Sequence, residues 1–336
     1  SSREASQIRR RVVEYLSSIG ELMRLDIIAF LTATLIAIQA RANGELSHLL
    51  GNPIQAATVS FGSGLIIITI FAATHHGMKQ GLIGIKNAVA EGNLQRWNLF
   101  AGMLGGTFVA IQTNTVPVVG VAIYSVASIS GQTASSLIVD SFGLAGGVKK
   151  EITFRRIFAS LITVLAVLVS VWDRIDAKNL SLIAVALGCL AGAIVGVQRA
   201  LNGQINESSE QSFTTSLLNF IMGTSFLVLF LLISLAFGEN ELVPLPTGPW
   251  WIYTGGAIGV IYIAFTSTIV QHLGVLTFTL YSVGGQLVGS LLIDLYSPTQ
   301  GVQVSAYLVT GIAMTYIGVI VGGVNNSQSR RRLTQK

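Results

Sequence analysis

The sequence predicts an all-α polytopic membrane protein in which ten transmembrane helices form two inverted five-helix repeats. Of its 336 residues, 51% are hydrophobic and only 10% are charged, which is too little charge to cover a soluble globule of this size. Residues 97–139 and 242–293 contain no Asp, Glu, Lys or Arg. Each of these runs is long enough for two crossings of about 20 residues. Polar and glycine positions also recur between the two halves of the chain.

Five apolar windows in the N-terminal half are bounded by charged residues or by glycine and proline breaks. The first is interrupted by Arg41, the third and fourth divide the first uncharged run, and the fifth contains only sixteen uncharged residues, 157–172. Each window approaches the length of one membrane crossing. The expected helices are 26–45, 53–74, 97–113, 117–139 and 154–172, with a long loop at 75–96.

Five further windows follow in the C-terminal half, where two of them divide the second uncharged run. The expected helices are 180–201, 212–237, 250–270, 274–293 and 304–324. Within the N-terminal tail, residues 12–23 place apolar side chains on one helical stripe, which fits either a helix on the membrane surface or a frayed tail. The predicted organisation is a cytoplasmic tail at 1–25, repeats at 26–173 and 174–324, and a basic cytoplasmic tail at 325–336.

The two halves share a pattern of residues at fixed separations. The stretch GQTASSLIVD at 131–140 is matched by GQLVGSLLID at 285–294, which lies 154 positions later. Earlier matches are displaced by 159 positions, so one five-residue contraction in a loop reconciles the two separations. Such a register of matches indicates a tandem duplication. The matches include Gln39 with Gln198, Asn43 with Asn202, Phe61 with Phe220, Gly64 with Gly223, Trp97 with Trp251, Gly102 with Gly256 and Gly105 with Gly259.

Lysine and arginine residues predict how the chain is oriented in the membrane. Each repeat has five crossings, an odd number, so the second repeat must start on the side opposite to the first. Of the 20 Lys and Arg residues, 17 fall on the face that holds both tails and 3 on the other face. This bias places both termini in the cytoplasm of a multi-pass protein of the inner or plasma membrane. The basic tails either contact anionic lipid or only set the topology.

Polar residues recur at every fourth position in the expected fourth and ninth helices. Residues four apart lie along one ridge of a helix, so each helix carries a polar strip about three turns long. A glutamine facing lipid would leave its amide unsatisfied, so the strips face either a water-filled cavity or other helices that they hydrogen-bond. We expect Gln132 and Gln286, with the serines beside them, to line a substrate cavity. The strips contain Ser128, Gln132, Ser136 and Asp140 in one helix and Ser282, Gln286, Ser290 and Asp294 in the other.

Further polar residues are candidates for the same cavity. The pair Gln39 and Asn43 in the expected first helix is repeated as Gln198 and Asn202 in the sixth, each pair four residues apart and therefore on one helical face. Asn219 and Gln112 have different residues at the matching positions, Ser60 and Thr266, so they suit an asymmetric substrate.

Two arginines, Arg41 and Arg199, do not match each other in the duplication. Both are expected to extend their charge to the membrane interface. The alternative for Arg199 is contact with an anionic group.

Asp140 and Asp294 fall at the ends of the two polar strips, and the predicted topology puts them on opposite sides of the membrane. Such positions are typical of residues that mark the boundary of a membrane span. The alternative is a pair of gates or proton-accepting carboxylates, one on each side, which would suit a cycle coupled to protons.

The sequence offers no constellation for enzymatic chemistry. It contains no HExxH, GxSxG, Walker lysine loop or CxxC. His75 and His76 lie at a span boundary without a carboxylate or cysteine partner nearby, so no metal site and no cofactor are expected. The basic residues gather at span ends and in the tails, where membrane orientation explains them better than nucleic acid does.

Four stretches, AIQARANGEL, SFGSG, GMLGGTFVAIQ and GQTASSLIVD, resemble the YdcZ-like branch of the drug/metabolite transporter superfamily, which is related to the EamA transporters. Members are usually one five-helix unit, and this chain is similar to two such units fused over about residues 26–324. The resemblance implies that spans one to four and six to nine enclose a central cavity, with spans five and ten outside. It also implies export or exchange of small metabolites.

These observations predict a secondary transporter that works by alternating access between two inverted repeats. The absence of charge near mid-membrane favours a small neutral, zwitterionic or amphipathic substrate, with protons as the candidate coupling ion. A passive channel or facilitator and a non-transporting membrane scaffold remain as alternatives. The oligomeric state is not predicted.

Overall fold

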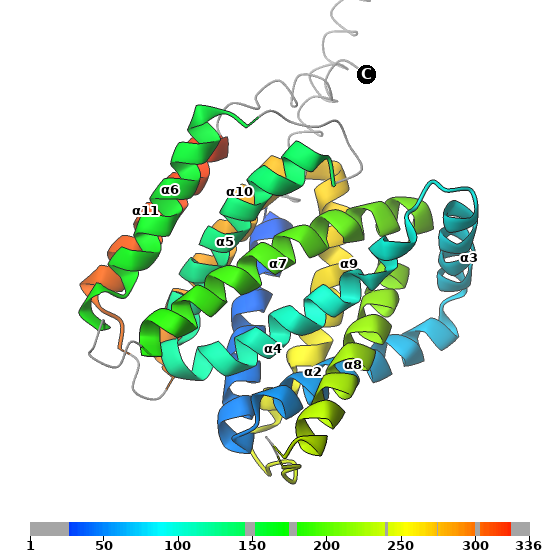
Figure 1. The fold of residues 1–336 in the computed structure, drawn as a ribbon, viewed down its shortest axis with the longest axis horizontal. Helices are drawn as coiled ribbons and strands as arrows, with labels where there is room; N and C mark the ends of the chain where they lie inside the picture. The colour runs from blue at the N-terminus through cyan, green and yellow to red at the C-terminus, as the bar shows by residue number, and fades with distance from the viewer. Residues whose placement is uncertain are drawn as a thin grey trace, which may run out of the picture.

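The chain is all-helical throughout the part that the computed structural model describes, where it forms eleven α-helices and no β-strand (Figure 1). The expected surface helix within residues 1–25 and the basic tail at 325–336 lie outside this part. The described residues are 27–144, 152–174, 180–238, 241–273, 275–299 and 303–323.

A helix lies in each of the ten ranges expected from the sequence, and one further helix lies between the second and third. Short 3₁₀ helices, η1, η2 and η3, occupy Arg96–Phe100, Trp172–Arg174 and Trp250–Tyr253. The α-helices are Ile27–Leu50, α2 (Pro53–Thr74), α3 (His76–Ala90), α4 (Ala101–Val119), α5 (Val121–Phe142), α6 (Phe154–Ser170), α7 (Leu180–Ser209), α8 (Ser212–Ala236), α9 (Gly255–Leu273), α10 (Val275–Tyr296) and α11 (Ala306–Gly323).

Several helix ends differ from the expected ends for identifiable reasons. The expected break between the third and fourth helices was placed before Pro117, but this proline lies in the last turn of α4. The break instead falls at Gly120, whose φ of 86° is in the left-handed region that favours glycine. Helix α7 continues eight residues past its expected end at 201, because Ile205 and Asn206 are buried against other helices although the sequence there is polar.

Helix α3 corrects the expectation of a long loop at 75–96. Its buried residues Met78, Gly81 and Ile85 lie on one face, while Lys79 and Lys86 are exposed on the other. Such a helix is amphipathic, with alternating apolar and charged residues, so a search for continuous apolar windows passes over it. It packs against α7 and α8 at one edge of the bundle (Figure 1).

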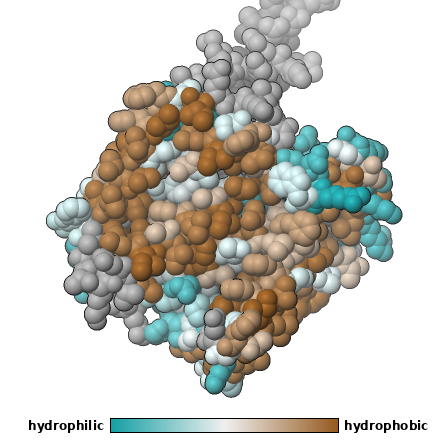
Figure 2. Space-filling model, viewed as in Figure 1, coloured by the Kyte–Doolittle hydropathy of each residue, from teal (hydrophilic) through white to brown (hydrophobic). Residues whose placement is uncertain are grey.

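Apolar side chains cover much of the outer surface of the helices. Phe154 and Leu161 of α6 and Ile317 of α11 are among many large apolar residues that are exposed. In Figure 2 hydrophobic residues spread over the face formed by several helices, while hydrophilic residues gather around α3. By length and composition, four helices among the described residues are long and apolar enough to cross a membrane: Ile27–Leu50, Pro53–Thr74, Leu182–Ser209 and Ser212–Ala236.

Helices α6 and α11 lie side by side at one edge of the bundle, where they contact α5 and α10 (Figure 1). The helix backbones approach closely at small residues, since Gly311 faces Ser170 and Gly318 faces Thr163. Small residues allow such contacts in a membrane, where dispersion rather than the hydrophobic effect joins helices.

Several of the close contacts between the two halves of the chain occur in matching pairs. A Cβ atom on Gly131 in α5 would overlap the carbonyl oxygen of Cys189 in α7, and one on Gly285 in α10 would overlap that of Phe30 in the first helix. Residues 131 and 285 are related by the 154-residue separation, and residues 30 and 189 by the 159-residue separation. Each contact is thus repeated with the halves exchanged. Two more sets behave alike: Gly102 at Asn219 with Gly256 at Ser60, and Gly64 at Phe220 with Gly223 at Phe61.

Candidate functional site

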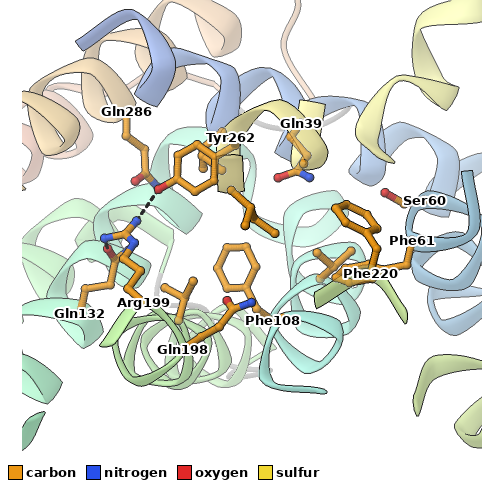
Figure 3. Close-up of a pocket in the computed structure, with 16 residues that line it drawn as sticks. Gln39, Ser60, Phe61, Phe108, Gln132, Gln198, Arg199, Phe220, Tyr262 and Gln286 are labelled. Carbon is orange, nitrogen blue, oxygen red and sulfur yellow. Dashed lines mark hydrogen bonds between the residues drawn. The ribbon is translucent and has the colours of Figure 1, made fainter. Parts of the chain in front are cut away.

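A cavity lies at the centre of the bundle, between the two halves of the chain (Figure 3). Its empty space is about 560 Å³ including the part that opens toward solvent, but only about 50 Å³ of it is cavity volume in the strict sense. The lining residues are Ile36, Gln39, Ser60, Phe61, Gly105, Phe108, Val109, Gln132, Val195, Gln198, Arg199, Phe220, Gly259, Tyr262, Ile263 and Gln286.

Eight helices contribute these residues: the first helix, α2, α4, α5, α7, α8, α9 and α10. None of the lining residues belongs to α6 or α11. These two helices occupy the ranges of the fifth and tenth expected spans, so the arrangement is the one that the family resemblance implied.

Most lining residues are related by the duplication. Phe61 of α2 and Phe220 of α8 are equivalents of one another, and their ring centroids lie 5.0 Å apart. Two equivalent residues can touch only where the two halves meet. Seven such pairs line the cavity: Ile36 with Val195, Gln39 with Gln198, Phe61 with Phe220, Gly105 with Gly259, Phe108 with Tyr262, Val109 with Ile263 and Gln132 with Gln286.

The two glutamines expected to line a cavity do so, from opposite helices. Gln286 of α10 is almost fully buried and Gln132 of α5 is half-buried. The amide of Gln132 donates to Ser128 Oγ at 3.2 Å, as the four-residue spacing within a helix allows. Ser128 and Ser282 are buried beside the glutamines but are not among the residues that line the cavity.

The remaining amide candidates divide into a lining set and a supporting set. Gln39 lines the cavity and donates to the carbonyl oxygen of Gly255 at 2.9 Å. Behind it, Asn43 donates to Gln112 Oε1 at 2.9 Å. Both supporting residues are fully buried, so they fix helix positions rather than meet a solute.

The equivalent network in the second half is built differently. Gln198 lines the cavity and donates to Asn219 Oδ1 at 2.9 Å. Asn219 in turn donates to Asn202 Oδ1 at 2.7 Å and to the carbonyl oxygen of Thr215 at 2.9 Å. Asn219 and Asn202 are buried behind the cavity. The first half has Ser60 in the place of Asn219, so this chain of hydrogen bonds has no counterpart there.

The sequence suggested that Arg199 extends its charge to the membrane interface. In the structure Arg199 lines the cavity instead. It lies ten residues before the end of α7, or about 15 Å along the helix. Its Nη1 donates to Gln132 Oε1 and its Nη2 to Tyr262 Oη, each at 2.6 Å (Figure 3). The position was missed because α7 was expected to end at 201, which would have put Arg199 beside solvent.

Arg41 is held by a residue of its own helix and by residues at the ends of other helices. It forms an ion pair with Glu45 at 2.6 Å, donates to the carbonyl oxygen of Ser297 at 3.0 Å, and lies 5.3 Å from the ring centroid of Trp251. These partners connect the first helix with α10 and η3. Arg41 does not line the cavity, and its charge is neutralised locally.

Asp294 of α10 is buried and accepts two hydrogen bonds from the start of α5. Val121 N donates to Oδ1 at 3.3 Å and Ala122 N to Oδ2 at 2.8 Å. The first backbone N–H groups of a helix have no partner inside the helix and carry its positive dipole end, so a carboxylate there is favourable. The side chain of Asp140, the matching residue in α5, lies outside the described part of the structure.

No group of three or more His, Cys, Asp or Glu side chains that could hold a metal ion occurs among the described residues. Cys189 is a free thiol in α7.

Comparisons with known proteins add a family and a fold. The model of a family described as "Putative inner membrane exporter, YdcZ" matches twice, over residues 25–169 and 183–321. No curated protein matches the chain. Nineteen solved chains are similar in fold. One of them, described only as "Crystal structure of protein", has 16% sequence identity and a TM-score of 0.52, and the match covers 94% of this chain and 99% of that one.

Proposed function

The chain belongs to the YdcZ family of inner membrane exporters in the drug/metabolite transporter superfamily, and from this premise we propose that it is a secondary transporter whose central cavity binds the solute. It is a polytopic membrane protein and a transporter rather than an enzyme. The solute is a small metabolite that is exported or exchanged. The observation that carries the proposal is that seven duplicated residue pairs line one cavity.

The proposed architecture is ten membrane spans in two inverted five-helix repeats, residues 26–173 and 174–324. The contacts at Gly131 and Gly285, repeated with the halves exchanged, are what a two-fold axis between the repeats requires. Each repeat has an odd number of spans, so that axis would lie in the membrane plane. Transporters with this symmetry commonly alternate access by rocking one repeat against the other around a site at mid-membrane.

We assign both termini to the cytoplasm from the distribution of lysine and arginine. Removing Arg199 from the loop count, because it lines the cavity, still leaves 16 basic residues on the face of the tails against 3 on the other face. A bias of this size orients multi-pass proteins.

The lining residues suit a solute without multiple charges. Gln39, Gln132, Gln198 and Gln286 supply hydrogen-bonding groups. Asn43, Gln112, Asn202 and Asn219 hold the helices behind them. Apolar and aromatic side chains make up most of the remaining wall, which favours a zwitterionic or amphipathic metabolite, or a neutral one.

We propose that Asp294 acts at a gate. Its carboxylate joins the end of α10 to the start of α5, and these helices belong to different repeats. Separating the repeats at this end of the bundle would break both hydrogen bonds. By the duplication, Asp140 would serve the opposite end, and protonation of either carboxyl would remove acceptors that hold its gate closed.

Replacing both Gln132 and Gln286 with leucine tests the proposed site. Leucine has a similar volume but no hydrogen-bonding group, so we expect at least a tenfold loss of export with normal membrane insertion. Metabolites in the medium are measured by mass spectrometry for bacteria that overproduce the wild-type chain, the double variant or no transporter. The matched control changes Gln80 and Gln95, which are exposed, to leucine. Unchanged export by the double variant would remove the glutamines from the site.

The alternatives give different outcomes in the same material. A passive channel would release metabolites from proteoliposomes without saturation and without counterflow. A scaffold would release none and would copurify with a partner in a fixed ratio. Either result would overturn the proposal of alternating access.

A further inference from the structure

Arg199 is the only charged residue among the described residues that line the cavity. Both of its hydrogen-bond partners, the amide oxygen of Gln132 and the hydroxyl of Tyr262, are neutral. Arg199 forms no ion pair within the described part of the chain. A guanidinium remains charged in proteins, and Arg199, which is half-buried, has no acidic side chain beside it in the wall of the cavity. The cavity therefore contains one uncompensated positive charge.

The guanidinium also has one N–H donor that makes no hydrogen bond. Arg199 Nε is buried and has no hydrogen-bond partner. Gln132 and Tyr262 orient the guanidinium from two sides, through Nη1 and Nη2 (Figure 3). An oriented guanidinium with an unused N–H is suited to a planar anionic acceptor such as a carboxylate.

Most of the remaining wall of the cavity is apolar, with the glutamines and one serine between the apolar side chains. Phe61, Phe108 and Phe220 line the cavity together with several aliphatic side chains. No lining residue carries a carboxylate that would neutralise an amine on the solute. The cavity thus combines one site for negative charge with surfaces for an apolar body.

The charge is specific to one half of the chain. The duplication pairs Arg199 with Ala40, which is fully buried, and pairs Tyr262 with Phe108. The arginine and the hydroxyl that accepts from it are therefore both confined to the second half.

From these observations we infer that the transported solute is a small organic monoanion, a carboxylate on a mainly apolar body, whose charged group binds Arg199. This inference rests on the proposed transport function and narrows it, because it excludes neutral and purely cationic solutes. Tyr262 and Gln132 are positioning residues that hold the guanidinium toward the cavity.

The test is stabilisation of the purified full-length protein by three probes with the same body. Butyrate, butyramide and butylammonium differ in charge at pH 7 but have the same carbon chain. A ligand that binds only the folded state raises the melting temperature. We expect butyrate at 10 mM to raise it by about 2 °C or more, and the amide and the amine to raise it by less than a quarter of that amount.

Variants at position 199 locate the bound anion. Arg199→Gln should abolish the butyrate shift, whereas Arg96→Gln, which removes an exposed arginine in η1, should keep it. If Arg199→Gln does not fold, Arg199→Lys keeps the charge with a different donor geometry and should reduce the shift without abolishing it. Equal shifts for butyrate and butyramide in the wild type, no butyrate shift at all, or a full butyrate shift in Arg199→Gln would each overturn the inference.

Metabolite release separates this inference from the proposed function. If the wild type releases neutral or cationic metabolites and Arg199→Gln releases them equally, the proposed transport function stands and the inference of an anionic solute is overturned. A wild-type chain that releases nothing but is still stabilised by butyrate through Arg199 would keep an anion site and remove the transport function.

Discussion

The two halves of the cavity are built on the same positions but do not carry the same side chains. Seven lining pairs are related by the duplication, and four of them are identical: the glutamines at 39 and 198 and at 132 and 286, the phenylalanines at 61 and 220, and the glycines at 105 and 259. Among the positions that line the cavity in either half, differences in polarity lie at Arg199 against Ala40, Tyr262 against Phe108, and Asn219 against Ser60. All three changes place the more polar group in the second half. The identical residues form the common wall of the cavity, and the residues that differ make the wall from the second half more polar than the wall from the first.

The largest effect on stability is expected from filling the two matching close contacts between the halves. Gly131→Leu and Gly285→Leu would each push a side chain into a backbone carbonyl of the opposite half, so we expect each to lose about 3 kcal/mol or more of stability. The measurement is the yield of monodisperse protein after detergent extraction. Gly62→Leu is the control, because nothing lies within 4 Å of the added Cβ.

If the halves are equivalent, Gly131→Leu and Gly285→Leu should be equally damaging. A large loss of stability for one variant and none for the other would show that the matching contacts contribute unequally to stability. The two halves would then be equivalent in their geometry but not in the free energy that their contacts contribute.

The gate proposal is sharpened by a smaller change. Asp294→Asn keeps one acceptor for the start of α5 but removes the second acceptor and the negative charge. We expect a loss of about 2 kcal/mol, which is typical of hydrogen bonds to a charged group. The melting temperature of the purified protein measures it, with the exposed Asp173→Asn as the control.

The duplication predicts a comparable loss for Asp140→Asn. If Asp294→Asn is as stable as the wild type, the proposal that Asp294 holds α10 and α5 together at a gate is wrong. A loss confined to Asp294 would mean that the two ends of the bundle are secured differently.

The smallest expected effect comes from exchanging the aromatic residues of one lining pair. Tyr262→Phe removes the hydroxyl that accepts from Arg199 Nη2, and we expect butyrate binding to weaken about fivefold, or about 1 kcal/mol. Phe108→Tyr, the reverse change in the first half, should alter binding less than about twofold because no arginine faces it. Titration of the melting temperature with butyrate measures both. Equal effects of the two changes would show that the hydroxyl does not act through Arg199.

The sequence alone predicted the helices and the duplicated glutamines, for a physical reason. Apolar windows in a membrane protein are long and continuous, and an amide such as Gln132 or Gln286 inside one stands out against them. The register of the two halves then related these amides to each other before any geometry was known. Gln39 and Gln198 were found in the same way.

Apolar windows alone did not predict the position of Arg199, because a hydropathy window cannot tell a helix end from a helix that continues through protein. The residues after 201 in α7 are polar, yet Ile205 and Asn206 are buried. A signal was present in the spacing, since Leu201 and Ile205 continue an apolar helical face through the polar stretch. The amphipathic α3 was missed for the same reason: its apolar positions are periodic rather than contiguous.

The pairing of lining positions sets a rule of parity for the charge of the cavity. In an assembly of two identical five-helix subunits, every side chain near the axis would occur twice, so such a cavity could hold two guanidinium groups or none. A cavity between unequal copies can hold one, as Arg199 opposite Ala40 does here. Fusion of the copies thereby makes an odd charge accessible, and with it the recognition of a singly charged solute.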